Sequence, residues 1–197
     1  MYLLATVPTE VTEKLDVIDN QKHTIKANYD LAGNIKNEFM IPDAKPIVWP
    51  LLNELIKQWK ERYQPQFHRL GSMFNKEEVQ LELFNTWVNF QKKHEFNPIH
   101  THDGVFSFVI WHKVPFHKKD EYARFPHMKE AQIKAGHFAF IVTSQMGKIL
   151  QHDICVDNSW EGKMALFPAD LNHIVYPFYT SDDERITISG NMKFNNI

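Results

Sequence analysis

The sequence predicts a mainly β protein, an antiparallel sandwich or barrel with an α-helix at its flank. After residue 79, short runs of apolar residues recur with a period of two and are separated by tight turns. Before it, the stretch 47–63 carries apolar residues at three- and four-residue intervals, a pattern typical of an amphipathic helix. Because 197 residues suffice for one substantial core, we expect a single domain over 1–197.

The expected domain has two parts. Residues 1–78 supply strands at 2–7 and 22–28 and the helix over 47–63, in whose first turn Pro50 is well tolerated. Residues 79–197 form the β core. Its strands are expected at 79–90, 104–111, 137–143, 148–156, 163–168 and 184–194.

One long connection interrupts the core. Residues 116–136 are rich in charge and are predicted to be partly helical. Long connections in β domains often act as lids over a site, although a solvated helix gives the same pattern. Turns at Met146-Gly147 and Glu161-Gly162 favour the antiparallel arrangement.

Charge and cysteine content exclude several function classes. A net charge of -2 gives no overall attraction to nucleic acid or to an anionic membrane. Cys155 is the sole cysteine, which excludes an internal disulfide and a cysteine-based zinc cluster and suits a reducing compartment such as the cytoplasm. The opening lacks the basic region of a secretory signal, and no apolar run approaches the ~18 residues of a membrane span, so we expect a soluble protein.

The octapeptide "NPIHTHDG" at 97–104 is the strongest candidate for a metal site. Side chains two apart in an extended segment share a face, so His100 and His102 can present imidazoles to one ion while Asp103 turns away. With 11 histidines in the chain, such a pair also arises by chance, and a third ligand is needed. "ALFPADLNHIVYPF" supplies His173, and Arg185 opens a strand twelve residues later.

The order of these blocks resembles a known family. "NPIHTHDG", "VFSFVIW", "ALFPADLNHIVYP" and "RITISGNMKFN" together are similar to the iron- and 2-oxoglutarate-dependent oxygenases, in particular a prolyl-hydroxylase-like subgroup common in marine bacteria and their phages. The resemblance covers about residues 85 to 195. It implies a double-stranded β-helix, a jelly-roll or cupin-like barrel, that holds Fe(II) at its mouth.

The resemblance also implies roles for individual residues. His100 would be the first ligand, His173 the distal ligand, and Arg185 the anchor for the far carboxylate of 2-oxoglutarate. A guanidinium fork suits that contact because it can donate two parallel hydrogen bonds. Thr187 resembles the hydroxyl member of an Arg-x-Ser pair, and the strand of Asn89 places polar groups beside the co-substrate.

One position departs from the family pattern. The broader superfamily places Asp or Glu two residues after the first histidine, where this chain has His102. We favour His100, His102 and His173 as ligands, with Asp103 accepting an imidazole N–H. The alternative set replaces His102 with Asp103, which requires the strand to end or bulge there.

The resulting prediction is an Fe(II)- and 2-oxoglutarate-dependent dioxygenase that hydroxylates a protein or peptide side chain or a small molecule. Its partners would be 2-oxoglutarate, dioxygen and the substrate, with ascorbate as a further candidate reductant, and neither nucleic acid nor membrane. Two alternatives stay open. One is a cupin-like three-histidine metalloenzyme that does not use 2-oxoglutarate, and the other is a non-enzymatic jelly-roll binding or structural module.

Overall fold

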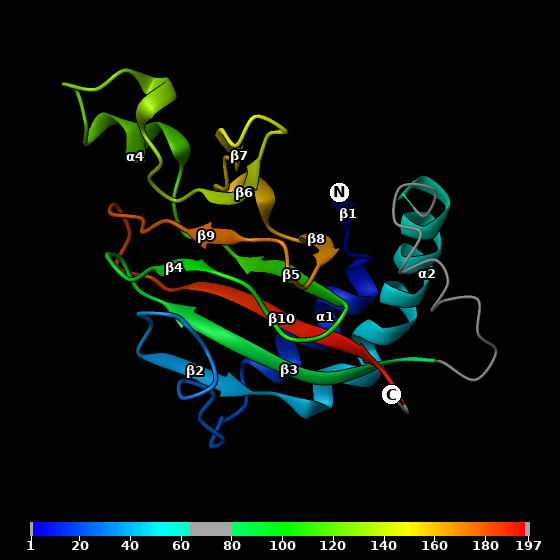
Figure 1. Cartoon of the computed structure of the whole chain (residues 1–197). Coiled ribbons are helices and arrows are strands. Elements are labelled where there is room, and N and C mark those ends of the chain that lie inside the picture. Colours follow the sequence, from blue (N-terminus) through cyan, green and yellow to red (C-terminus); the bar gives the residue numbers. More distant parts are fainter. Residues whose placement is uncertain (1, 64–79, 196–197) are drawn as a thin grey trace.

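The computed structural model describes residues 2–63 and 80–195, which form two antiparallel sheets that face each other (Figure 1). The larger sheet has the strand order β1 (Leu3–Thr6), β8 (Lys163–Pro168), β5 (Phe106–Lys113), β10 (Arg185–Phe194), β3 (Leu81–Gln91) and β2 (Asn37–Met40). The smaller sheet has the order β4 (Asn97–His100), β9 (His173–Val175), β6 (Phe138–Thr143) and β7 (Ile149–Ile154).

The predicted mainly β, jelly-roll fold class is confirmed, with one correction to its description. Among residues 2–63 and 80–195, no strand of the larger sheet is paired with a strand of the smaller sheet. The architecture is therefore an open sandwich of two sheets and not a closed barrel. Sheets of this kind bury the side chains of their inner faces between them.

Most of the predicted strands correspond to observed ones, namely β1, β3, β5, β6, β7, β8 and β10. Val79, the expected start of β3, lies outside the described residues. The expected strand at 22–28 is wrong, because only Lys26 there forms an isolated bridge, to Phe39. The sequence reading also missed β2, β4 and β9, which at three or four residues are too short to display a period.

Two helices cover the outer face of the larger sheet. α1 (Thr9–Asp19) was not anticipated, and α2 (Lys45–Tyr63) begins two residues before its predicted start, after the short 3-10 turn η1 (Pro42–Ala44). Pro50 therefore lies inside the helix and not in its first turn. No helix of the described part of the chain is both long and apolar enough to span a membrane.

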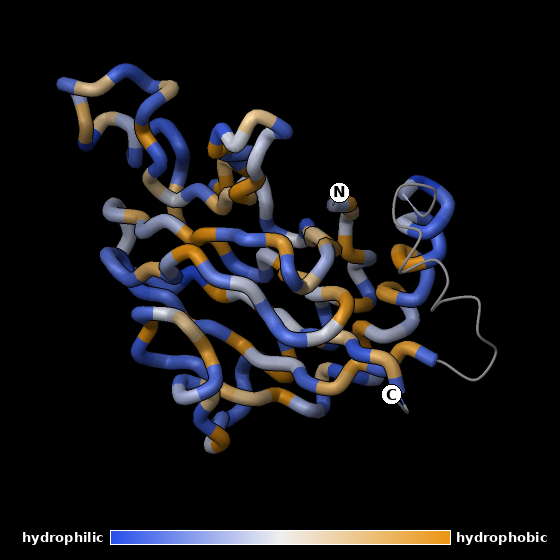
Figure 2. Tube along the Cα trace, in the orientation of Figure 1, coloured by the Kyte–Doolittle hydropathy of each residue, from blue (hydrophilic) through white to orange (hydrophobic). Residues whose placement is uncertain are grey.

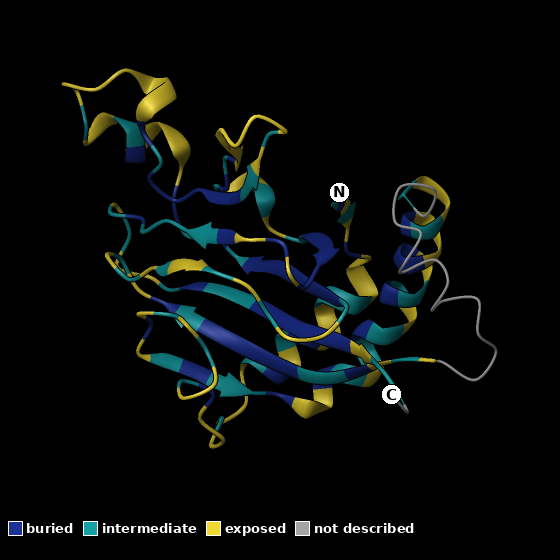
Figure 3. Ribbon diagram, in the orientation of Figure 1, coloured by how far each residue is buried: buried dark blue, intermediate teal, exposed yellow. Residues whose placement is uncertain are grey.

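Alternation along β5 separates the two halves of the core. Phe106, Phe108 and Ile110 point towards the helices, where they join a buried cluster with Trp59 of α2. Val109, Trp111 and similarly placed side chains point the other way and pack against the smaller sheet. As Figure 3 shows, the middle of the larger sheet is buried on both faces.

The insert 116–136 projects from one end of the sandwich. It contains α4 (Lys118–Ala123) and the short turn η3 (Glu130–Gln132), and Figure 2 shows its largely hydrophilic character. Glu121 of α4 is fully buried and accepts hydrogen bonds from the backbone N–H groups of Tyr179 and Thr180. The insert is thereby tied to the loop between β9 and β10.

The edge strand β2 contains a fully buried carboxyl group, Glu38. Its Oε2 accepts one hydrogen bond from Asn28 Nδ2 at 3.2 Å, while its Oε1 has no donor among the described residues. The loop before β2 lies directly over it, since a Cβ at Gly33 would come within 2.8 Å of Glu38 Oε1 and 2.4 Å of Asn97 Oδ1. A side chain at position 33 would require the Asn97 and Glu38 side chains to move. Burial, assisted by the charge of Glu95, raises the pKa of Glu38 to about 7.

The buried Glu38 makes stability depend on pH. Between its ordinary pKa of 4.5 and the raised pKa of about 7, the folded state binds more protons than the unfolded state, so stability falls as pH rises through this window. We expect Glu38→Gln to be more stable than the parent protein at pH 8 by about 1–3 kcal/mol, and similar to it near pH 4.5.

Urea unfolding at pH 5, 6.5 and 8 measures this difference. The matched control is Glu54→Gln, because the Glu54 side chain is 59% exposed and should leave the profile unchanged. An equal decline of the unfolding free energy in Glu38→Gln and the parent would show that Glu38 is not the group responsible.

Candidate metal centre

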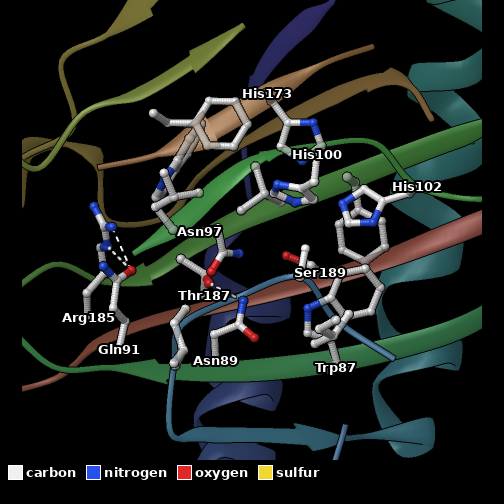
Figure 4. Close-up of a pocket in the computed structure, with 18 of the residues that line it drawn as sticks. Trp87, Asn89, Gln91, Asn97, His100, His102, His173, Arg185, Thr187 and Ser189 are labelled. Carbon is white, nitrogen blue, oxygen red and sulfur yellow. Dashed lines mark hydrogen bonds between the residues drawn. The ribbon is translucent and has the colours of Figure 1, made fainter. Parts of the chain in front are cut away.

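Three histidines converge between the two sheets (Figure 4). One ligand nitrogen from each of His100, His102 and His173 lies within 4.8 Å of the others. His100 ends β4 and is paired with His173, the first residue of β9, so strand pairing itself brings these two together. His102 follows two residues after β4 and completes the group.

Hydrogen bonds to backbone carbonyls determine which nitrogens face the site. His100 Nδ1 donates to Pro98 O at 2.7 Å, and His173 Nδ1 donates to Leu171 O at 2.9 Å. Because a carbonyl can only accept, each Nδ1 carries the proton and each Nε2 keeps a free lone pair. In metal-binding imidazoles, one ring nitrogen binds the metal while the other commonly donates its N–H to a carbonyl or carboxylate. That hydrogen bond fixes the tautomer and the ring orientation.

The electrostatics of the group favour neutral rings. Burial lowers the pKa of His100, lowers that of His102 to about 4, and lowers that of His173 well below its ordinary value. Mutual repulsion among the three rings lowers the values for His102 and His173 further. At neutral pH all three are unprotonated at one nitrogen, which is the form that binds a divalent metal ion.

Asp103 is placed differently from the histidines. It is exposed, and it is not part of the three-residue group found within the described ranges. The acceptors for His100 and His173 are backbone carbonyls and not the Asp103 carboxylate. A donor set of three imidazoles fits a first-row transition metal such as iron, but it lacks the carboxylate of a two-histidine, one-carboxylate centre.

A pocket extends from the histidines across the larger sheet. Alternation on β10 turns Arg185, Thr187 and Ser189 towards it, and each is paired with a β3 residue that also lines it. These β3 partners are Gln91, Asn89 and Trp87 respectively. The pocket holds about 590 Å³ of empty space when its solvent-open mouth is included.

Thr187 and Asn89 are the two other residues predicted to lie beside the co-substrate, and they contact each other in the pocket wall. Asn89 Nδ2 donates to Thr187 Oγ1 at 3.3 Å. The buried Asn89 Oδ1 has no hydrogen-bond donor among the described residues. This amide oxygen can therefore accept a hydrogen bond from a bound molecule.

Arg185 is buried at the far end of the same pocket, with 1% of its surface exposed. Its Nη1 donates to Gly136 O at 2.7 Å and its Nη2 to Tyr176 O at 3.1 Å. Its Cζ lies 5.7 Å from the ring centroids of both Phe116 and Phe178. Burial lowers the pKa of Arg185 to about 9, so the group still carries its positive charge at neutral pH.

The surroundings of Arg185 include both ends of the insert. Phe116 precedes α4 and Gly136 follows η3, so the insert leaves and returns to the core beside the guanidinium. Glu121 of α4 holds the 179–180 turn next to Phe178. The insert is therefore part of the wall around Arg185.

The sequence reading missed several residues of the pocket. Gln91 continues the two-residue period of Trp87 and Asn89, a signal that could have identified it, but its contact with Arg185 depends on the β3–β10 register. Asn97 lines the pocket and lies in the octapeptide 97–104, but it was not among the predicted site residues. The loop before β2 contributes Leu31, Ala32 and Ile35, which have no periodic signal.

Comparison with known proteins agrees with this geometry. Residues 85–191 match the model of a family described as "Putative 2OG-Fe(II) oxygenase". A prolyl-4-hydroxylase of Pseudomonas putida is similar in structure, with a TM-score of 0.56, 13% identity, and coverage of 98% of this chain and 91% of that chain. An oxidoreductase of the 2OG-Fe(II) oxygenase family from Burkholderia pseudomallei gives a TM-score of 0.53 and 14% identity, covering 98% of this chain and 84% of that chain. At these identities the two structures establish a shared fold. No curated protein matches the chain.

The geometry predicts which substitutions weaken metal binding. His102→Ala and His173→Ala should each weaken Fe(II) or Mn(II) binding by more than about 100-fold, because each removes a ligand, while Asp103→Ala should bind like the parent. Anaerobic calorimetric titration with Mn(II) measures the affinities directly.

His152→Ala is the matched control for this series, because His152 is an exposed histidine on β7. If Asp103→Ala lost the metal and His102→Ala kept it, the ligand set would be His100, Asp103 and His173 instead.

Proposed function

Because the chain belongs to the putative 2OG-Fe(II) oxygenase family, we propose that His100, His102 and His173 hold its iron and that Arg185 receives the far carboxylate of 2-oxoglutarate. The chain is a 2-oxoglutarate-dependent Fe(II) oxygenase, and it acts as a single domain over 1–197. The observation that carries the residue assignment is the convergence of three neutral imidazoles and one buried guanidinium on the same pocket.

Bound Fe(II) couples the oxidative decarboxylation of 2-oxoglutarate to the insertion of one oxygen atom of dioxygen into a C–H bond of the substrate. The three imidazoles are neutral ligands, so the charge of the metal is reduced less than it would be by a set that includes a carboxylate. The backbone carbonyls of Pro98 and Leu171 keep two of the three rings oriented. Trp87, Phe138 and Phe167 line the pocket beside the histidines and exclude water from it.

The role of Arg185 follows from its charge and burial. A buried guanidinium is stabilised by an anion that brings its own hydrogen-bond acceptors, and the far carboxylate of 2-oxoglutarate is such a group. Thr187 lies on the same face of β10 and adds a hydroxyl donor. Asn89 orients that hydroxyl through its hydrogen bond to Oγ1.

The substrate side of the pocket suits an aliphatic group that carries N–H donors. Leu31 and Ile35 of the loop before β2 form an apolar part of the pocket wall. Asn89 Oδ1 and Asn97 Oδ1 are buried acceptors without a donor among the described residues. Since 2-oxoglutarate at neutral pH offers only acceptors, these oxygens are better matched by an amino acid, free or within a peptide, whose amino or amide N–H groups can donate to them.

We propose that the protein works in a reducing compartment such as the cytoplasm. A reducing compartment such as the cytoplasm keeps iron in the Fe(II) state and keeps Cys155 unpaired, and Cys155 is free.

The first test of the proposal is 2-oxoglutarate turnover without substrate. With Fe(II), ascorbate and 2-oxoglutarate, the parent should form succinate, His173→Ala should form none, and Arg185→Lys should show a KM for 2-oxoglutarate raised by about 10- to 100-fold. Succinate is quantified by chromatography, and circular dichroism confirms that each variant is folded.

Equal turnover of the parent and Arg185→Lys at low 2-oxoglutarate would favour a three-histidine enzyme that does not use Arg185 for a co-substrate. That outcome would retain the metal centre and reject the co-substrate assignment.

The second test concerns the substrate class. We expect succinate formation to be stimulated by a peptide or free amino acid with an aliphatic side chain, and not by a fatty acid of the same length, because only the former supplies N–H donors. Mass spectrometry of the stimulating compound should show a gain of one oxygen atom. Stimulation by the fatty acid alone would contradict the donor requirement.

A further inference from the structure

Among the described residues, Arg185 donates hydrogen bonds only to neutral groups. Its four hydrogen bonds go to the side-chain amide of Gln91 and the backbone carbonyls of Gly136 and Tyr176, all of which are neutral. Glu121 is the carboxylate that acts on it electrostatically, but the oxygens of Glu121 accept from Tyr179 and Thr180. Within the described residues no carboxylate is hydrogen-bonded to the guanidinium.

Gln91 occupies the position that a carboxylate usually takes beside an arginine. Its Oε1 accepts from Arg185 Nε at 3.1 Å and from Nη2 at 2.6 Å, which is a two-point contact on one edge of the fork. The other end of the amide is also held, because Nε2 donates to Glu95 O at 2.6 Å. Because arginine only donates and a carbonyl only accepts, these two contacts fix the orientation of the amide.

The hydrogen bonds leave one donor of the guanidinium for a ligand, so the two parallel hydrogen bonds expected from the sequence are not both available in this arrangement. Nε donates one hydrogen bond, Nη2 donates two and Nη1 donates one, so among the described residues the second N–H of Nη1 has no acceptor. Arg185 lines the pocket and is buried, so an acceptor there would come from a bound molecule. The contact with Gln91 thus fixes the plane of the Arg185 guanidinium, and the positive charge of Arg185 remains available to a bound anion.

We infer that Gln91 is a positioning residue for the co-substrate: its neutral amide holds the Arg185 fork in place without neutralising it, and thereby gives the site its selectivity for a 2-oxo acid with a far carboxylate. This inference rests on the proposed function of Arg185. A glutamate at 91 would hold the fork and cancel its charge, while an apolar side chain of similar length would leave the charge and release the fork. The Gln91 amide holds the fork and leaves its charge in place.

The experiment compares the parent, Gln91→Glu, Gln91→Met and the control Gln21→Glu, which adds the same charge at an exposed position after α1. Each protein is loaded with Mn(II), so that no turnover occurs, and titrated calorimetrically with 2-oxoglutarate and with 2-oxopentanoate, which has the same carbon number but no far carboxylate. Thermal unfolding is recorded for each protein.

We expect the parent and Gln21→Glu to bind 2-oxoglutarate at least 10-fold more tightly than 2-oxopentanoate. Gln91→Glu should lose this preference, while an affinity for 2-oxopentanoate within about two-fold of the parent would show that the rest of the site is intact. Gln91→Met should weaken 2-oxoglutarate binding by about 3- to 10-fold, and it decides the question if Gln91→Glu fails to fold.

Retention of the full preference by Gln91→Glu, or by Gln91→Met where the former does not fold, would overturn the role of Gln91. A parent protein that shows no preference for 2-oxoglutarate would instead contradict the assignment of Arg185 itself, so the two failures are distinguishable.

Discussion

The pocket depends on the register in which β3 pairs with β10. In this register Arg185 lies beside Gln91, Thr187 beside Asn89 and Ser189 beside Trp87, so a row of polar groups faces the smaller sheet. Alternate residues such as Val88 and Ile188 face the helices and are fully buried there. A slip of one residue would exchange these two sets and put a guanidinium into the apolar core. The hydrophobic pattern that stabilises the fold therefore also determines which side chains reach the pocket.

The two halves of the site come from different sheets. The smaller sheet supplies His100 and His173 through the β4–β9 pair, and the larger sheet supplies the polar row. The site is formed only when the two sheets pack together. An aromatic cluster that includes Phe138, Phe140 and Phe167 stabilises this packing. Phe138 stacks on His173 with ring centroids 5.4 Å apart, so the same cluster that joins the sheets also fixes a proposed ligand.

Much of this organisation was predictable from the sequence, because the long strands have a clear period of two. His100, His102, His173 and Arg185 were identified by residue type and spacing together with the order of the blocks, and the structure brings them to one pocket. The loop before β2 could not be predicted, since its position over the pocket depends on a close approach at Gly33 and not on any periodic pattern. The contact of Gln91 with Arg185 is likewise a product of register, which a single sequence does not encode locally.

The attachment of the insert beside Arg185 has a thermodynamic consequence. Phe116 and Gly136, the two ends of this segment, both touch the guanidinium, and Glu121 braces the neighbouring turn. A macromolecule that bound the insert and shifted its position would change the affinity of the proposed Arg185 site for 2-oxoglutarate. By thermodynamic linkage, 2-oxoglutarate bound there would change the affinity of the insert for that macromolecule by the same factor. Binding of one ligand would thus change the affinity for the other, although the two ligands would not touch each other.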